Sequence, residues 1–294
     1  MPGRNLTKLA LGTVQFGVDY GIANLRGRTS FAEAEQILSL AAANGVATLD
    51  TAIAYGRSEQ VLGQIGVSGF QVVTKLPAVP SDCRDIAGWV SSQIEGSLER
   101  LGIDSLHAVL LHRPEQLLGP QGDALGTALM ALKSRGHAKK IGVSIYSVDE
   151  LVPLMQCLTL DLIQAPLSIL DQRLITSGWL TRLNSEGIEV HTRSAFLQGL
   201  LLMPVATRPE KFHPWRAVWD SWDHWLHKVG KTPLEACLAF ALSVEGVDKV
   251  VIGTDSIAHL HQILAASGAG LSSLPIWPAT FDLDLLNPGR WSAL

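Results

Sequence analysis

Four polar residues each lie at or just after a short apolar run, and together their side chains can deliver a proton. Asp50 ends ATLD, Tyr55 lies in AIAYG, Lys75 ends VVTK and His112 ends VLLH. A tyrosine hydroxyl has an ordinary pKa of about 10, and a nearby ammonium lowers it by stabilising the phenolate. Such a tyrosine can protonate the oxygen that becomes negative when a carbonyl carbon receives a hydride. These residue types therefore predict carbonyl reduction, with Tyr55 as the acid.

The other three residues have predicted roles in the same step. Lys75 supplies the positive charge, and Asp50 keeps that lysine protonated and in place. His112 hydrogen-bonds the carbonyl oxygen and orients it. Taken alone, each residue also has an ordinary structural explanation. A lone histidine at a strand end, for example, is usually a structural group whose hydrogen bonds are satisfied. Only the joint occurrence indicates a catalytic group, and the fold must gather its members.

Composition indicates a folded protein with no general affinity for polyanions. Of 294 residues, 47% are hydrophobic and 17% charged, which allows a sizeable core and excludes disorder as the main state. A formal net charge of −4 gives no attraction to nucleic acid or to an anionic membrane. No apolar run reaches the ~18 residues that span a bilayer, and the first residues lack a signal-peptide pattern, so we expect a cytoplasmic protein. Cys83, Cys157 and Cys237 are widely spaced and indicate neither a zinc site nor disulfides.

Short apolar runs alternate with longer helical patterns along the chain. The predicted strands cover residues 8–12, 46–51, 71–76, 108–112, 140–144, 162–165, 189–193 and 249–253. Their apolar middles are typical of a parallel sheet covered on both faces. Among the helical patterns, the one after Ser30 has Glu33 and Gly45 at the positions of a capping box and a C-terminal glycine.

Eight strands alternating with about eight helices predict an α/β fold, the (β/α)8 or TIM barrel. A doubly wound sheet is the alternative, and it would usually carry GxGxxG after its first strand. The first strand instead runs into LALGTVQFG, which does not match. No linker rich in Pro, Gly or Ser divides the chain, so we expect residues 1–294 to form one domain. The carboxyl ends of barrel strands meet at one face, which would bring the four polar residues together.

One connection, residues 194–231, is unusually long and rich in tryptophan. It holds half of the eight tryptophans of the chain, and Trp215, Trp219 and Trp222 follow helical spacing. We therefore expect a short amphipathic helix. Two interpretations stay open: the helix packs on the barrel, or these tryptophans line a substrate pocket together with Tyr20.

The motifs resemble the aldo-keto reductase family nearly from end to end. LDTAIAYGRSE, from Leu49 to Glu59, is similar to the family pattern LDTAxxYGxSE, and VVTKL, LLHRP, GVS and LIQAPLS follow in order. The resemblance implies the barrel fold and a reversible, NAD(P)H-dependent reduction of aldehydes or ketones. It also puts the four polar residues at the positions of the family's catalytic tetrad.

The resemblance further implies a path for a nicotinamide dinucleotide. The carboxamide would be held after the fifth strand and at the sixth, and the first strand would end beneath the nicotinamide ring. The segment after the seventh strand would wrap the pyrophosphate, and the start of the last helix would hold the adenosine phosphate end. The implied contacts are Gly12, Thr13, Asp50, Ser144, Gln164, Arg193, Ser194, Phe196, Leu197, Gly199, Gly253, Thr254, Asp255, Ser256, His259 and Gln262.

Three departures from the family pattern leave the choice between NADP(H) and NAD(H) open. Ile145 stands where family members often have asparagine. Arg193 stands where an aromatic residue usually stacks on the nicotinamide, although an arginine plane can also stack. Many members bind the 2′-phosphate with one lysine or arginine near the last strand and another early in the last helix. Here the first position falls on Gly253 or Thr254 and the second on His259. Asp255 would repel a phosphate, whereas a protonated His259 would attract one.

The barrel pattern also allows two alternatives to a carbonyl reductase. One is a regulatory or redox-sensing barrel that binds the cofactor with little turnover, and the intact tetrad argues against it. The other is a hydrolase or lyase, which would need a metal cluster or a carboxylate pair. No HxH spacing occurs at a strand end and no second acid accompanies Asp50, so we expect no metal.

The predicted partner is a small-molecule carbonyl or alcohol. A polar, sugar-like substrate is mildly preferred, because LGTVQFGVDYGIAN and RSAFLQGLL resemble reductases near bacterial glycan pathways. Neither nucleic acid nor a membrane is expected as a partner, and the sequence leaves the oligomeric state open.

Overall fold

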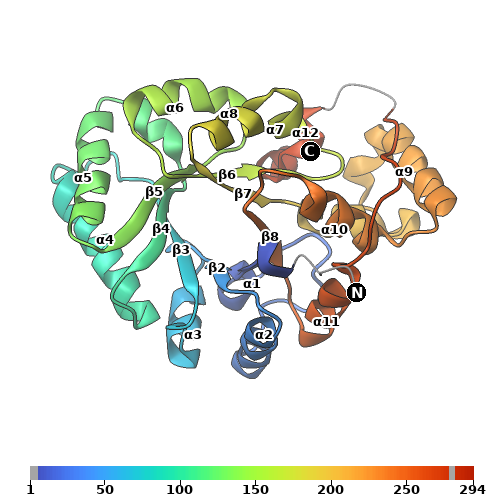
Figure 1. Ribbon diagram of the computed structural model, residues 1–294, viewed down its shortest axis with the longest axis horizontal. Helices are drawn as coiled ribbons and strands as arrows, with labels where there is room; N and C mark the ends of the chain where they lie inside the picture. The colour runs from blue at the N-terminus through green and yellow to red at the C-terminus, as the bar shows by residue number, and fades with distance from the viewer. Residues whose placement is uncertain (1–5, 278–281) are drawn as a thin grey trace.

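In the computed structural model, eight parallel strands close into a barrel with helices around it (Figure 1). The structure describes residues 6–277 and 282–294. Each strand pairs with the next along the chain, and β8 pairs with β1 to close the ring. The expected (β/α)8 barrel is confirmed. The strands are β1 (Leu9–Gly12), β2 (Thr48–Asp50), β3 (Gln71–Leu76), β4 (Leu106–Leu111), β5 (Ala138–Ser144), β6 (Leu162–Pro166), β7 (Glu189–Arg193) and β8 (Lys249–Gly253).

Helices connect the strands and form the outer layer. None in the described residues is long and apolar enough to cross a membrane. The α-helices are α1 (Val14–Gly17), α2 (Phe31–Ala43), α3 (Ser58–Ile65), α4 (Ile86–Leu101), α5 (Gly122–Ser134), α6 (Leu151–Cys157), α7 (Arg173–Thr176), α8 (Trp179–Ser185), α9 (Arg216–Val229), α10 (Pro233–Ser243), α11 (Ile257–Ala266) and α12 (Leu283–Leu286). The 3-10 helices are η1 (Leu6–Lys8), η2 (Pro114–Leu118), η3 (Val148–Glu150), η4 (Leu197–Leu202), η5 (Val205–Thr207), η6 (Glu210–Trp215) and η7 (Pro288–Ala293).

Strand bounds agree with the predicted ones to within two residues. β3, β7 and β8 have the predicted bounds, whereas the other five shift at one or both ends. Lys8 belongs to η1, and His112 follows the last residue of β4. The shifts arise because apolar patterning marks burial, whereas a strand ends where its hydrogen-bonded pairing ends.

The barrel has a narrow interior, and the main core lies between the strands and the surrounding helices. A small interior cluster consists of Val73, Ala108, Leu110 and Leu162. At Gly142, a Cβ atom would lie 2.0 Å from the carbonyl oxygen of Leu162, so only glycine fits there. The much larger second cluster packs outward-facing strand residues against the helices. This two-layer core explains the apolar strands, because both strand faces are covered.

The pairing register brings the carboxyl ends of the strands to one face of the barrel. Gly12 of β1 lies beside Asp50 of β2 on one side and Gly253 of β8 on the other. Ser144 of β5 likewise lies beside Gln164 of β6. These residues were predicted from separate motifs, and closure of the ring makes them neighbours.

The long connection forms an amphipathic helix, but its tryptophans pack inward. In α9, Trp219 and Trp222 are buried, and their indole N–H groups donate to the carbonyl oxygens of Phe212 (2.9 Å) and Leu201 (3.1 Å). Trp215, just before α9, packs against the Phe212 ring at a centroid distance of 6.3 Å. Trp219 and Trp222 are thus core residues, and none of the three tryptophans is among the residues that line the cavity beside Asp50. An apolar helix face buries itself against the nearest large apolar surface, which here is the core.

The predicted capping box at α2 forms only in part. The Ser30 hydroxyl accepts a hydrogen bond from the backbone N–H of Glu33, as expected for an N-cap. The Glu33 carboxylate turns away and accepts from the backbone N–H of Ile257, in the first turn of α11. Helices α2 and α11 are neighbours because β1 and β8 pair, so a free helix N–H of α11 competes for this carboxylate.

Candidate active site

An ion pair buried at the carboxyl face of the barrel is the centre of the candidate site. Asp50 is the last residue of β2, and Lys75 is the penultimate residue of β3. The Lys75 ammonium donates to Asp50 Oδ1 at 2.6 Å and to the carbonyl oxygen of Thr51 at 2.9 Å. Both side chains are almost fully buried. Burial and these two hydrogen bonds fix the position of the Lys75 ammonium group.

Tyr55 and His112 complete the cluster. The Lys75 Nζ lies 5.2 Å from the centroid of the Tyr55 ring. The Tyr55 and His112 rings meet edge to face, with centroids 5.9 Å apart. No described residue hydrogen-bonds the Tyr55 hydroxyl, so this group is available to a ligand. The barrel thus brings the four predicted residues together.

Electrostatics keep Lys75 charged and His112 neutral. Burial alone would lower the pKa of Lys75, but the Asp50 carboxylate beside it raises that pKa above its ordinary value. Burial, followed by the positive charge of Lys75, lowers the pKa of His112 from 6.5 to about 4. At neutral pH, His112 can therefore donate one ring N–H while carrying no charge.

Close packing of two loops holds Tyr55. A Cβ atom at Gly17 would lie 1.7 Å from the carbonyl oxygen of Tyr55, so a glycine is required there. The Ser58 hydroxyl lies 2.9 Å from the carbonyl oxygen of Thr13 and donates to it. The Glu59 carboxylate, which is buried, accepts from Thr74, Ser97 and Arg100. The YGRSE motif therefore works as a structural clamp around the tyrosine.

Gln164 joins this network in a way that the sequence did not indicate. Its Nε2 donates to Asp50 Oδ2 at 2.6 Å, and its Oε1 accepts from the Ser144 hydroxyl at 3.3 Å. Each oxygen of Asp50 thus has a buried donor, from Lys75 and from Gln164. The resemblance marked Asp50 and Gln164 separately as cofactor contacts, which does not identify them as a hydrogen-bonded pair.

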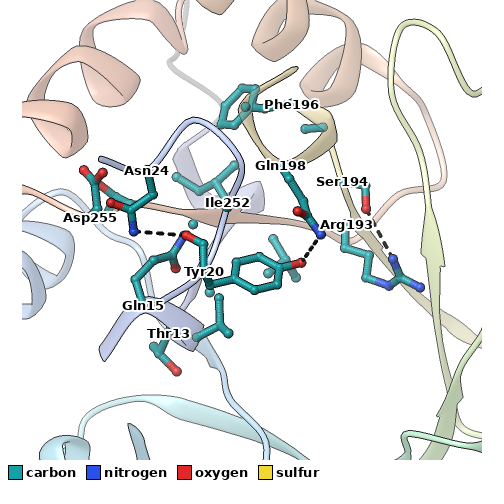
Figure 2. Close-up of a pocket in the computed structure, with 18 of the residues that line it drawn as sticks. Thr13, Gln15, Tyr20, Asn24, Arg193, Ser194, Phe196, Gln198, Ile252 and Asp255 are labelled. Atoms are coloured by element: carbon teal, nitrogen blue, oxygen red, sulfur yellow. Dashed lines mark hydrogen bonds between the residues drawn. The ribbon is translucent and has the colours of Figure 1, made fainter. Parts of the chain in front are cut away.

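A cavity opens beside this cluster, between β1, β7 and β8 (Figure 2). Tyr20, predicted for the substrate pocket, lies in its lining. Most of the predicted cofactor contacts lie there too. They are Gly12, Thr13, Asp50, Gln164, Arg193, Ser194, Phe196, Gly199, Gly253, Thr254, Asp255 and His259. The structure thus gathers residues from the first, second, sixth, seventh and eighth strand regions around one space.

Four of the predicted cofactor contacts do not line the cavity. Ser144 lies behind Gln164, to which it donates. Leu197 is buried in the core, and Ser256 caps α11 by accepting from the backbone N–H of His259 at 3.2 Å. Gln262 is exposed on α11.

The loop that contains Tyr20 and the loop that contains Gln198 contact each other at the cavity, which also has lining residues that the sequence did not indicate. The Tyr20 hydroxyl accepts from Gln198 Nε2 at 3.0 Å, as Figure 2 shows. A Cβ atom at Gly199 would lie 2.6 Å from Ala23 Cβ, so the loops touch there as well. The lining residues that were not predicted individually are Val14, Gln15, Gly21, Ala23, Asn24, Leu202, Val251 and Ile252, whereas Ala195 and Gln198 lie in the segment after β7 that was expected to wrap the pyrophosphate. No local pattern marks them, because the contact joins segments almost 180 residues apart.

A second polar cluster lies at the amino ends of the strands. Glu189, the first residue of β7, accepts from His191 Nε2 at 2.6 Å. It also contacts His107 Nε2 at 3.2 Å and the Lys140 ammonium. None of these four residues lines the cavity. No group of three or more His, Cys, Asp or Glu side chains in the described part of the chain could hold a metal ion.

A closed (β/α)8 barrel with a lysine–aspartate pair, a tyrosine and a histidine at its carboxyl face defines the class of this protein. The profile of the Aldo/keto reductase family matches residues 8–273. The chain therefore belongs to the aldo-keto reductase family.

Curated relatives match over shorter stretches. An aldo-keto reductase of Mycolicibacterium vanbaalenii is 39% identical over 132 residues, which are 42% of this chain and 45% of that protein. Aldo-keto reductase Rv2971 of Mycobacterium tuberculosis is 35% identical over 126 residues, 40% of this chain and 42% of the relative. These matches span less than half the length of either relative.

Similarity to solved structures covers most of the barrel. The aldo-keto reductase AKR11C1 from Bacillus halodurans, in its holo form, has a TM-score of 0.71 at 22% sequence identity. The superposition covers 90% of this chain and 88% of that one. At this identity the similarity shows the fold alone.

Proposed function

We propose that this protein is an NAD(P)H-dependent reductase of aldehydes or ketones, with Tyr55 as the general acid. Family membership supports an oxidoreductase that acts on carbonyl compounds. The observation that carries the proposal is the placement of the Lys75 ammonium, buried and paired with Asp50, 5.2 Å from the Tyr55 ring beside an open cavity. A regulatory barrel with little turnover would not need this arrangement.

The four residues divide the work of protonating a carbonyl oxygen. When bound, the reduced dinucleotide supplies a hydride to the carbonyl carbon. The Tyr55 hydroxyl donates its proton to the oxygen, and the Lys75 ammonium stabilises the phenolate that results. The neutral His112 donates an N–H to the same oxygen and sets its direction. Asp50 takes no proton in this scheme, because it keeps Lys75 charged.

Polar groups of the cavity fit a dinucleotide. Gln15 Oε1 is buried without a hydrogen-bond partner among the described residues, although Gln15 lines the cavity. Gln198 adds a second amide to the lining from the loop after β7, whereas the Asn24 amide is already engaged within its own turn. Buried polar atoms are normally paired, so an unpaired one in a cavity indicates a polar ligand. We infer that these residues would hold the cofactor's polar groups.

The choice of cofactor depends on the end of the cavity near α11. There Asp255 Oδ1 lies 2.5 Å from His259 Nδ1, so the carboxylate offsets any charge on the histidine. A carboxylate accepts a hydrogen bond from the 2′-hydroxyl of NAD(H) and repels the 2′-phosphate of NADP(H). We therefore propose that NADH is accepted at least as well as NADPH. Fluorescence titration with each tests this, and tighter binding of NADPH than of NADH by roughly tenfold, about 1.4 kcal/mol, would contradict it.

Replacement of Tyr55 by phenylalanine tests the proposed mechanism. Tyr55→Phe should lower kcat by roughly a thousandfold or more while the dissociation constants of the dinucleotides stay within about twofold. Tyr20→Phe is the matched control, because it removes a second tyrosine hydroxyl from the same cavity and should retain turnover. Near-normal turnover by Tyr55→Phe would refute the mechanism. Cofactor binding by the wild type without turnover of any carbonyl in a broad screen would favour the regulatory alternative.

A further inference from the structure

Arg193 brings a positive charge to the cavity that no carboxylate balances in the described part of the chain. Its Nη2 donates to the carbonyl oxygen of Ile145 at 2.9 Å, and its Nη1 donates to the Ser194 hydroxyl at 3.2 Å. Both acceptors are neutral. The Asp50 carboxylate in the same lining is already engaged by Lys75 and Gln164. No ion pair among the described residues therefore offsets the positive charge of the guanidinium at the edge of the site.

The fold holds this charge in place. The guanidinium lies over the Tyr146 ring, 4.5 Å from its centroid, and the bond to Ile145 anchors it to the segment after β5. Ser194 follows with a φ of 68°, a left-handed conformation that few non-glycine residues adopt. One ring contact and two hydrogen bonds thus position the guanidinium at the edge of the cavity.

Arg193 is also close enough to act on the candidate catalytic group. It ends β7 and lines the cavity beside Asp50 and Tyr55. After burial and the charge of Lys75, Arg193 is among the groups that lower the pKa of His112. Any ring that transfers a hydride to a carbonyl held by Tyr55 and His112 must lie in the same space.

We propose that Arg193 makes the site bind the reduced nicotinamide dinucleotide in preference to the oxidised one, and so favours carbonyl reduction. This inference rests on the proposed function. The reduced ring is neutral, and when its hydride moves to the carbonyl carbon the ring becomes a cation. The oxygen meanwhile takes the Tyr55 proton, so atoms and electrons balance. A fixed guanidinium nearby raises the free energy of the cationic ring and leaves the neutral ring almost unaffected.

The quantity to measure is the ratio of two dissociation constants, oxidised over reduced, for dinucleotides with the same adenosine half. Differences between NAD and NADP cancel in this ratio. Replacement of Arg193 by methionine should lower the ratio by roughly tenfold, which corresponds to about 1.4 kcal/mol. Most of the change should come from tighter binding of the oxidised form. Arg193→Lys, which keeps the charge, should retain a larger part of the ratio than Arg193→Met.

Two further variants make the test specific. Arg113→Gln removes an exposed arginine that pairs with Glu115, and it should leave the ratio unchanged. Tyr146→Leu removes the stacking partner, and it should lower the ratio less than Arg193→Met because the charge stays in the protein. Tyr146→Leu also provides a second measurement if Arg193→Met does not fold.

Fluorescence titration of the purified full chain distinguishes the outcomes. If Arg193→Met weakens binding of the oxidised and the reduced dinucleotide equally, the arginine contributes only stacking. If the ratio of the two dissociation constants does not change, its charge does not act on the nicotinamide ring. Either result overturns the inference. The proposed function fails separately, if Tyr55→Phe retains turnover or if the wild type binds neither form. Failure to bind either form would overturn both.

Discussion

Two clusters of paired charge occupy opposite ends of the same barrel, and they differ in what they leave unpaired. At the amino ends, the Glu189 carboxylate accepts from His107, His191 and Lys140, and none of these four residues lines the cavity beside Asp50. At the carboxyl ends, the Asp50–Lys75 pair stands beside a cavity and beside the Tyr55 hydroxyl, which has no described partner. Both clusters contain a paired carboxylate and lysine.

The comparison teaches that a buried ion pair alone does not identify a site. Charges taken out of water must be paired wherever they occur, so pairing is common to structure and catalysis. An available donor next to an open space is what differs between the two ends. We therefore expect that the same chemical change will alter turnover at one end and stability at the other.

Loss of the lysine at the carboxyl end should have the largest effect on activity. Lys75→Met removes the charge that stabilises the Tyr55 phenolate, so kcat/KM should fall by roughly a thousandfold or more. Steady-state kinetics measures the loss, and circular dichroism checks that the variant is folded. Lys140→Met is the matched control, because it removes a lysine from the other cluster and should change kcat/KM less than about threefold, about 0.7 kcal/mol. Equal losses of activity in both variants would contradict the comparison.

Loss of the carboxylate at the amino end should act on stability. Glu189→Gln leaves Lys140 and the two histidines without their charged partner, so the free energy of unfolding should fall by about 2–3 kcal/mol. Urea denaturation measures this change. Turnover per folded molecule should stay at the wild-type value. A large drop in kcat with unchanged stability would show that this end takes part in function.

The same carboxylate should also make stability depend on acid. Burial would raise the pKa of Glu189, but hydrogen bonds from His107, His191 and Lys140 hold it below its usual range. The unfolded chain then takes up a proton more readily than the folded one, so this contribution is fully present above pH ~4.3 and is lost progressively as pH falls below that value towards the lower folded-state pKa. Glu189→Gln should therefore flatten the acid side of the stability profile. An identical profile in the variant would refute the assignment.

Substitution of Gln164 tests whether a residue that hydrogen-bonds Asp50 contributes to turnover. Gln164→Leu removes the donor to Asp50 Oδ2. The Asp50 carboxylate should then attract the Lys75 ammonium more strongly, and the ammonium should stabilise the Tyr55 phenolate less. We expect kcat at saturating cofactor to fall roughly tenfold, about 1.4 kcal/mol, with the alkaline limb of its pH profile shifted. Ser144→Ala, which leaves the bond from Gln164 to Asp50 in place, should have a smaller effect. A change in cofactor affinity alone would restrict Gln164 to cofactor binding.

Protonation of His112 should have the smallest effect near neutral pH. Its pKa is lowered to about 4 by burial and then by Lys75, so kcat/KM should show no limb near pH 6.5 that depends on this residue. Because the folded-state pKa is depressed, the unfolded chain binds the proton first, and stability should decline as pH falls from 6.5 towards 4. Thermal unfolding of the wild type and His112→Gln across this range would reveal the difference. An acid limb of activity at pH 6.5 that disappears in His112→Gln would contradict the neutral state.

Several parts of the fold and the candidate site could be read from local pattern. The strands were identifiable because each short apolar run is covered on both faces, and Asp50, Lys75 and His112 could be assigned to the carboxyl face because each lies at or near the end of a strand. Other parts depended on contacts between distant segments. The burial of Trp219 and Trp222, the turn of Glu33 towards α11, and the bond from Gln164 to Asp50 each join elements far apart along the chain.

The amino-acid sequence by itself determined the barrel, the family and the residues that carry the proposed proton chemistry, because periodicity and motif order are local properties of the chain. Only the tertiary structure decided which polar groups are paired and which face a cavity. It buried the tryptophans of α9, brought Tyr20 against Gln198, and left the charge of Arg193 without a carboxylate partner among the described residues. Pairing and burial depend on the distance between segments in space, and that distance is set when the ring of strands closes.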